Sequence, residues 1–133
     1  MEHEAGEECQ TLAVAHLLGK RWCIPVLEEI RLSGSAKFSS MKKSLPGITA
    51  KNLSTVLSDL CESRMVEKKQ VSFGSSLVEE YTLGSMGEAV CKVVEGMKAL
   101  GIEWYGTNQY CKNTKCSGCR LFRQEHEAML RRY

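Results

Sequence analysis

The sequence predicts an α+β fold that is mainly α-helical, and three observations lead to this prediction. Apolar residues recur at helical spacing over most of the chain, the alternation typical of strands is confined to residues 65–83, and a Gly-Ser turn divides that region. At 133 residues with 43% apolar residues, the chain suits a single domain with a true core. It contains no apolar run of about 18 residues, so we expect no membrane span.

The first half of the chain predicts helices, and boundary residues help to place them. Gly19 suits a helix end, and Pro25 suits a first helical turn, where its missing N–H costs nothing. Thr49 suits an N-cap after the turn at Pro46-Gly47. The predicted elements are, in order, helix 10–18, helix 24–32, an extended link at 37–38, helix 39–44 and helix 49–63.

The second half begins with strand-like alternation and then returns to a helical period. Residues 65–73 and 77–83 alternate loosely around Gly74-Ser75-Ser76, which predicts a β-hairpin with a small tip. The helix predicted at 85–104 carries an apolar stripe that exceeds the needs of a small core, so we expect part of it to face a partner. A polar loop at 106–118 and a helix at 120–132 follow.

Helix 49–63 has two faces of different chemistry. One face is apolar and is formed by Leu53, Val56, Leu57, Leu60 and Cys61. The other face carries short polar and cationic side chains, namely Lys51, Asn52, Ser54, Thr55 and Ser58. Such side chains approach base edges and phosphates without filling a groove, so this helix points to double-stranded DNA as a partner.

Charge is distributed unevenly, although the net charge is only +2. Residues 1–8 hold four acids and no base, whereas residues 37–70 hold seven bases against three acids (+4) and residues 104–133 hold six against two (+4). Local basic surface suits phosphate contact. The N-terminus lacks a hydrophobic signal region, so we expect a cytoplasmic protein.

The order of the predicted elements is that of a winged helix-turn-helix. In this arrangement helices 39–44 and 49–63 form the helix-turn-helix, and the second of them projects its polar face into the ~12 Å major groove. The tip of the hairpin then reaches the DNA backbone or the adjacent minor groove. The expected domains are an acidic tail at 1–8, a winged-helix domain at 9–104 and a cysteine-containing segment at 105–133.

Several short motifs occur together at characteristic separations between residues 9 and 100. They are Cys9, Leu18-Gly19-Lys20-Arg21-Trp22, Lys37-Phe38-Ser39, Leu45-Pro46-Gly47-Ile48-Thr49, Tyr81-Thr82-Leu83 and Gly87. In this combination the chain resembles the HxlR-type winged-helix transcriptional regulators, which are relatives of the MarR family. The resemblance implies a homodimer, held by extra N- and C-terminal helices, that binds an inverted repeat in a promoter.

The resemblance also implies roles for individual residues. The groove contacts expected from it come from Lys51, Asn52, Ser54 and Thr55. The expected phosphate contacts come from Lys42 and Lys43 and, in the wing, from Lys68, Lys69, Ser75 and Ser76. Cys9 aligns with a cysteine that senses oxidants or electrophiles in several members, a role that requires a reactive thiolate.

Seven cysteines are many for an intracellular chain. Cys111, Cys116 and Cys119 have C-x4-C-x2-C spacing, which suits zinc or an iron–sulfur cluster with a fourth ligand from elsewhere. A redox pair, a disulfide and thiols without a role stay open for the same residues. Cys61 and Cys91 lie on predicted apolar faces, so we expect them to be core residues, and we expect Cys23 to be buried at the start of the second helix.

The sequence therefore favours a DNA-binding transcriptional regulator that responds to oxidation or metal through its cysteines. Two alternatives stay open. One is a winged-helix adaptor for protein contacts with a structural zinc site, and the other is a thiol oxidoreductase that uses Cys116 and Cys119. No Ser/His/Asp set, phosphate loop or carboxylate pair indicates another enzyme, so we expect the protein not to be an enzyme.

Overall fold

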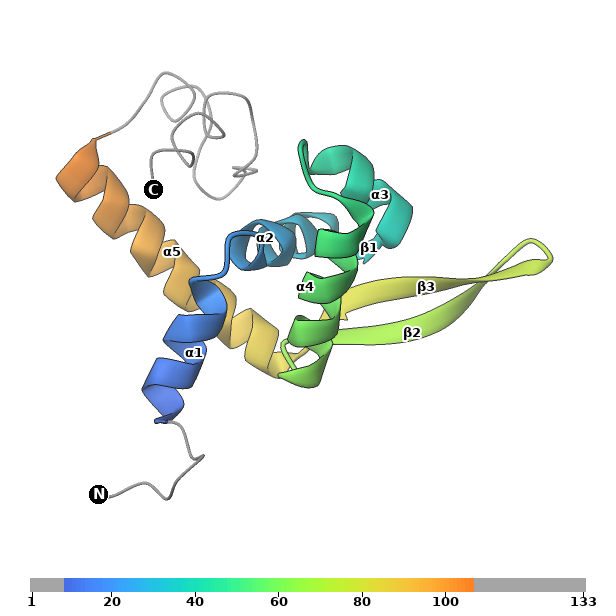
Figure 1. Ribbon diagram of the computed structural model, residues 1–133, viewed down its shortest axis with the longest axis horizontal. Helices are drawn as coiled ribbons and strands as arrows, with labels where there is room; N and C mark the ends of the chain where they lie inside the picture. Colours follow the sequence, from blue (N-terminus) through green and yellow to red (C-terminus); the bar gives the residue numbers. More distant parts are fainter. Residues whose placement is uncertain (1–8, 107–133) are drawn as a thin grey trace.

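The structure is a computed structural model, and it describes residues 9–106. Within this range five helices surround one side of a small antiparallel sheet (Figure 1). The mainly helical α+β fold and its winged helix-turn-helix order are therefore confirmed. The elements are α1 (Gln10–Leu18), α2 (Cys23–Ser33), β1 (Ser35–Lys37), α3 (Phe38–Ser44), α4 (Ala50–Glu62), β2 (Val66–Phe73), β3 (Ser76–Leu83) and α5 (Ser85–Tyr105).

The largest difference from the predicted elements lies between α2 and α3. The extended link was expected at 37–38, but the strand is Ser35–Lys37 and Phe38 already belongs to α3. The reason is sheet pairing, because buried Ala36 lies opposite Tyr81 of β3. Between residues 9 and 105, each remaining predicted boundary lies within about two residues of the observed one, a margin typical of fraying helix ends.

The sheet has the strand order β1-β3-β2, and both pairings are antiparallel. In the hairpin Phe73 lies opposite Ser76, so the turn holds only Gly74 and Ser75 and is one residue shorter than expected. Gly74 has φ +64°, the left-handed conformation that the first position of a tight hairpin turn requires. The hairpin extends well beyond the helices and forms the wing (Figure 1).

Helix α2 is the centre of the core. Its residues Leu27 and Ile30 are fully buried, and the helix packs against α3, α4, α5 and β3. At Gly87, helix α5 comes close to Met65, the residue before β2, and an added Cβ would overlap the Met65 carbonyl oxygen. A glycine is therefore required at this position if α5 is to keep its place on the core.

The outer helices contribute less to the core. Helix α1 has no buried residue, and the C-terminal half of α5 extends away from the body on the side opposite the wing (Figure 1). No helix among residues 9–106 has the length and apolar character needed to cross a membrane. The expected tail at 1–8 and the helix at 120–132 lie outside the described residues, so the predicted division into domains stays a prediction.

Candidate nucleic-acid interface

A tight turn sets the angle between α3 and α4. Ile48 N–H donates to the Leu45 carbonyl oxygen at 3.2 Å, and Gly47 between them has φ +87°. Proline at the second position and a left-handed glycine at the third are the sequence pattern of a type II β-turn. Leu45 and Ile48 are buried while Pro46 and Gly47 are exposed, so the turn anchors both helices on the core.

Helix α4 begins as the sequence predicts. The Thr49 hydroxyl oxygen accepts a hydrogen bond from the Asn52 backbone N–H at 3.0 Å, which confirms Thr49 as the N-cap. Such a cap stabilises a helix by about 1 kcal/mol. At its C-terminus the Met65 N–H donates to the Leu60 carbonyl oxygen across Arg64, whose φ is +66°. This reversal directs the chain into β2.

One face of α4 is buried and the other is exposed, as the sequence predicts. The residues buried against the core are Leu53, Val56, Leu57 and Leu60. The exposed residues on the other side include all of the predicted groove contacts, Lys51, Asn52, Ser54 and Thr55, together with Ser58. These side chains are therefore available to a partner, and their contact with DNA stays a prediction.

The helix that precedes α4 carries two lysines. Lys42 and Lys43 are exposed in the last turn of α3, and within the described residues neither forms an ion pair. Asp59, further along α4, is paired with Lys20 at 3.0 Å. This ion pair was not predicted, and it joins α4 to the loop between α1 and α2.

The wing is less basic than its lysines suggest. Lys68 pairs with Glu79 at 3.6 Å, and Lys69 lies directly opposite Glu80 in the neighbouring strand. Ser75 is exposed in the turn, as a backbone contact requires. The acids on β3 therefore compensate much of the positive charge of β2, and the contact of these lysines with phosphate stays a prediction.

A second contact of the wing was not predicted. The Lys37 ammonium lies 4.2 Å from the centre of the Phe73 ring, within the range of a cation–π interaction. Lys37 immediately precedes α3, and Phe73 is the last residue of β2. This contact ties the end of the wing to the helix-turn-helix.

The cysteines fall into different environments. Burial raises the pKa of the Cys23 thiol to about 11 and also raises the pKa of Cys61 and Cys91. Cys23 and Cys91 are buried and Cys61 is half-buried on the core side of α4, so the expected core placement is confirmed for the first two. Cys9 is half-exposed at the N-terminus of α1.

The predicted metal ligands cannot be placed. Cys111, Cys116 and Cys119 lie outside the described residues, and no other set of three potential metal ligands gathers within residues 9–106. Zinc or an iron–sulfur cluster at these cysteines therefore stays a prediction.

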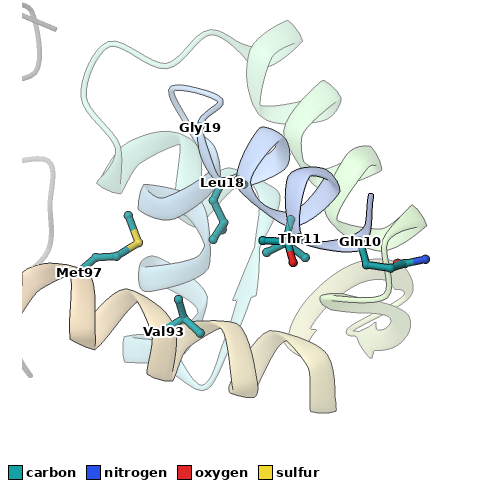
Figure 2. A pocket seen from close by; sticks show the side chains of 8 residues that line it. Gln10, Thr11, Leu18, Gly19, Val93 and Met97 are labelled. Atoms are coloured by element: carbon teal, nitrogen blue, oxygen red, sulfur yellow. The ribbon is translucent and has the colours of Figure 1, made fainter. Parts of the chain in front are cut away.

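An apolar groove runs between α1 and α5. It is lined by Gln10, Thr11, Val14, Ala15, Leu18, Gly19, Val93 and Met97. Figure 2 shows Val93 and Met97 of α5 beneath Leu18 of α1, which points toward them. The sequence had suggested the stripe on α5 but not that α1 would border it.

These features define the class of the protein: a winged helix-turn-helix with an exposed recognition helix typical of DNA-binding regulators. The model of the HxlR-like helix-turn-helix family matches residues 17–109, which is most of the chain. The chain belongs to this family, so the predicted resemblance is confirmed. Its curated relatives are transcriptional regulators, so the expectation that the protein is not an enzyme is also confirmed.

Two similar curated proteins come from Bacillus subtilis. The uncharacterized HTH-type transcriptional regulator YvaP is 30% identical over 88 residues, which are 66% of this chain and 80% of YvaP. The uncharacterized HTH-type regulator YdzF is 27% identical over 86 residues, 65% of this chain and 78% of YdzF.

Among solved structures, the reduced form of the transcriptional regulator YodB from B. subtilis is similar, with a TM-score of 0.63 and 26% identity. The match covers 74% of this chain and 95% of that structure. YodB is also known in a diamide-treated form (TM-score 0.61) and in a quinone-bound form (TM-score 0.59). The chain is therefore a helix-turn-helix transcriptional regulator.

Proposed function

We propose that the protein is a homodimer that binds an inverted-repeat operator through α4, with Lys51, Asn52, Ser54 and Thr55 in the major groove. The observation that carries the proposal is the exposure of this polar face at the N-terminal end of a capped helix. Backbone N–H groups at a helix N-terminus attract phosphate, and short polar side chains read base edges.

The charge around α4 supports the same proposal. From residue 38 to residue 58 the chain has three lysines, Lys42, Lys43 and Lys51, and no acidic residue. The exposed residues of this segment therefore add no carboxylate that the DNA backbone would repel. Lys42, Lys43 and the wing residues Lys68, Lys69 and Ser75 are the proposed phosphate contacts.

The exposed stripe on α5 supports the dimer. Val93, Met97, Leu100 and Trp104 follow one another at spacings of four, three and four residues, the seam of a helix that packs on another helix. Their exposed fractions run from 45% to 73%, and the groove beside α1 continues this surface. Such a surface exceeds the scattered apolar residues of an ordinary monomer, and a second copy would cover it.

Selection from a library of random double-stranded DNA tests the function. We expect the protein to enrich an inverted repeat whose half-site centres are about one helical turn, or a multiple of it, apart. Binding should weaken steeply as the salt concentration rises. Weak binding that is insensitive to salt and to sequence would instead favour the adaptor alternative.

We further propose that Cys9 makes DNA binding sensitive to oxidants or electrophiles. It is half-exposed, whereas burial raises the pKa of the other cysteines among residues 9–106 and so keeps them protonated. Cys9 precedes the first residue of α1, and Ala13 N–H donates to its carbonyl oxygen at 2.8 Å. A modified Cys9 side chain would therefore disturb α1 beside the proposed dimer surface.

Replacing Cys9 with serine is expected to remove the response to oxidants. Diamide joins two thiols in a disulfide and is itself reduced to a hydrazine, so oxidised Cys9 would be bonded to a second thiol. This oxidation should lower the operator affinity of the unmodified protein about tenfold or more, a coupling in the usual range for a switch. The Cys9→Ser variant should bind like the reduced protein with or without diamide, as measured by fluorescence anisotropy. Cys61→Ser serves as the matched control and should keep the response. A Cys9→Ser variant that still responds to diamide would show that another thiol is responsible for the response.

A further inference from the structure

Glu28 of α2 is a buried carboxylate held by two cations. Its side chain is 1% exposed, and Oε2 accepts hydrogen bonds from Arg31 Nη2 at 2.7 Å, from Arg31 Nε at 3.0 Å and from Lys98 Nζ at 2.8 Å. Arg31 lies on the same helix, whereas Lys98 lies on α5, 70 residues away in sequence. The Glu28–Lys98 pair is therefore a direct polar link between α2 and α5.

The position of Lys98 on α5 gives this link a particular role. Val94 is the last buried residue of α5, and Lys98 follows it by one turn. Residues 99–106 are all half-exposed or exposed, so the helix leaves the body after Lys98. About 10 Å of α5 then extends past it, at 1.5 Å for each residue. This extension carries Leu100 and Trp104 of the proposed dimer surface.

The other end of the link belongs to the DNA-binding unit. Helix α2 packs against both α3 and α4, so Glu28 moves with the recognition helix. A small change in the angle between α2 and α5 would displace the dimer surface relative to α4. In a dimer the same change would occur twice, and the separation of the two recognition helices would change with it.

We propose that Glu28 and Lys98 are positioning residues that fix the angle at which α5 leaves the DNA-binding body, and thereby the half-site spacing that the dimer accepts. The proposal rests on the dimeric, inverted-repeat binding proposed above. Arg31 lies on α2 with Glu28 and holds the carboxylate in place, whereas Lys98 alone among the three donors' residues spans the two helices. Because the Lys98 side chain is only 10% exposed and its Nζ lies 2.8 Å from Oε2, a change in the angle of α5 would break this directional contact. Apolar contacts alone would tolerate a range of angles.

The chemistry of the link favours a role in geometry over a role in stability. Removing charges from water offsets much of the attraction within a buried ion pair, and apolar replacements are often as stable. Within residues 9–106, moreover, Glu28 Oε1 is buried and has no hydrogen-bond partner. Among the same residues, the donors from Arg31 and Lys98 all meet Oε2.

The test uses the full chain and the inverted repeat that the unmodified protein selects from a random library. The repeat is synthesised again with one or two base pairs inserted or removed between its half-sites. Each added base pair shifts and rotates one half-site, so the unmodified protein should bind the altered spacings about 100-fold more weakly. In Lys98→Met this preference should fall to about tenfold or less, while affinity for an isolated half-site stays unchanged.

Further variants distinguish a loss of helix positioning from a loss of folding. Lys98→Arg should restore the preference, because its guanidinium can donate to the same carboxylate. The double variant Glu28→Met/Lys98→Met leaves no unpaired buried carboxylate, so it should fold and still lose the preference. Lys92→Met, on an exposed lysine of the same helix, should keep it.

The outcomes distinguish this inference from the function on which it rests. If Lys98→Met and the double variant keep the spacing preference of the unmodified protein, the positioning role is wrong while the proposed function stands. If the unmodified protein itself selects no inverted repeat, both proposals are wrong.

Discussion

Replacing Lys51 and Asn52 together with alanine is expected to lower the affinity for the selected operator about 100-fold or more, since each specific groove contact contributes about 1–3 kcal/mol. Both side chains are exposed in the first turn of α4. The helix itself should persist, because the hydrogen bond to the Thr49 cap comes from the backbone N–H of residue 52. The loss of one lysine should also reduce the slope of log affinity against log salt concentration by about one.

The matched control is Lys92→Ala, which removes one positive charge from an exposed position on α5. This control should bind the operator like the unmodified protein. Circular dichroism and thermal unfolding should be the same for all three proteins. An operator affinity that does not change in the Lys51/Asn52 variant would exclude α4 as the recognition helix.

Placing two glutamates in the exposed stripe, Val93→Glu and Leu100→Glu, is expected to produce a monomer. The two residues are 56% and 58% exposed, so the monomer fold should tolerate the change. In a dimer the same carboxylates would be buried against apolar side chains, at a high cost in free energy. Because two linked half-site contacts bind more tightly than one, operator affinity should fall by about 10²–10⁴-fold.

Sedimentation measures the mass of this variant directly, and Ala99→Glu provides the control. Ala99 is also exposed on α5, but it lies on the face with Glu88, Lys92 and Glu95. The control should remain a dimer with full operator affinity. A Val93/Leu100 variant that stays dimeric would assign the interface to another surface of the molecule.

The recognition helix was the part of the fold best predicted from the sequence. Its apolar residues recur at helical spacing, and a proline-glycine turn and a capping threonine mark its start, so local chemistry determines it. The wing was predicted with a turn one residue too long. Serine suits a turn or a strand, and Ser76 is placed in the strand by its pairing with Phe73, which the sequence does not reveal. The stripe on α5 was predicted to face a partner, and much of it is indeed exposed.

The ion pairs that join distant elements could not be predicted. Lys20 and Asp59 are 39 residues apart, and Glu28 and Lys98 are 70 apart. On the sequence each of these residues has the appearance of an ordinary surface charge, Lys20 in a loop and the other three on amphipathic helices. Burial of Glu28 depends on α5 lying across α2, which is a property of the whole fold and of no local pattern.

The contact between Lys37 and Phe73 bears on the energetics of the wing. A two-stranded ribbon that extends beyond its core ordinarily samples many orientations in solution. Here one end of the ribbon is attached to the segment that leads into α3, at 4.2 Å from ammonium to ring. A preorganised ribbon loses less conformational entropy when it meets a DNA backbone. In the proposed complex with DNA, this smaller loss of entropy would offset part of the phosphate attraction that the acids of β3 remove from the wing.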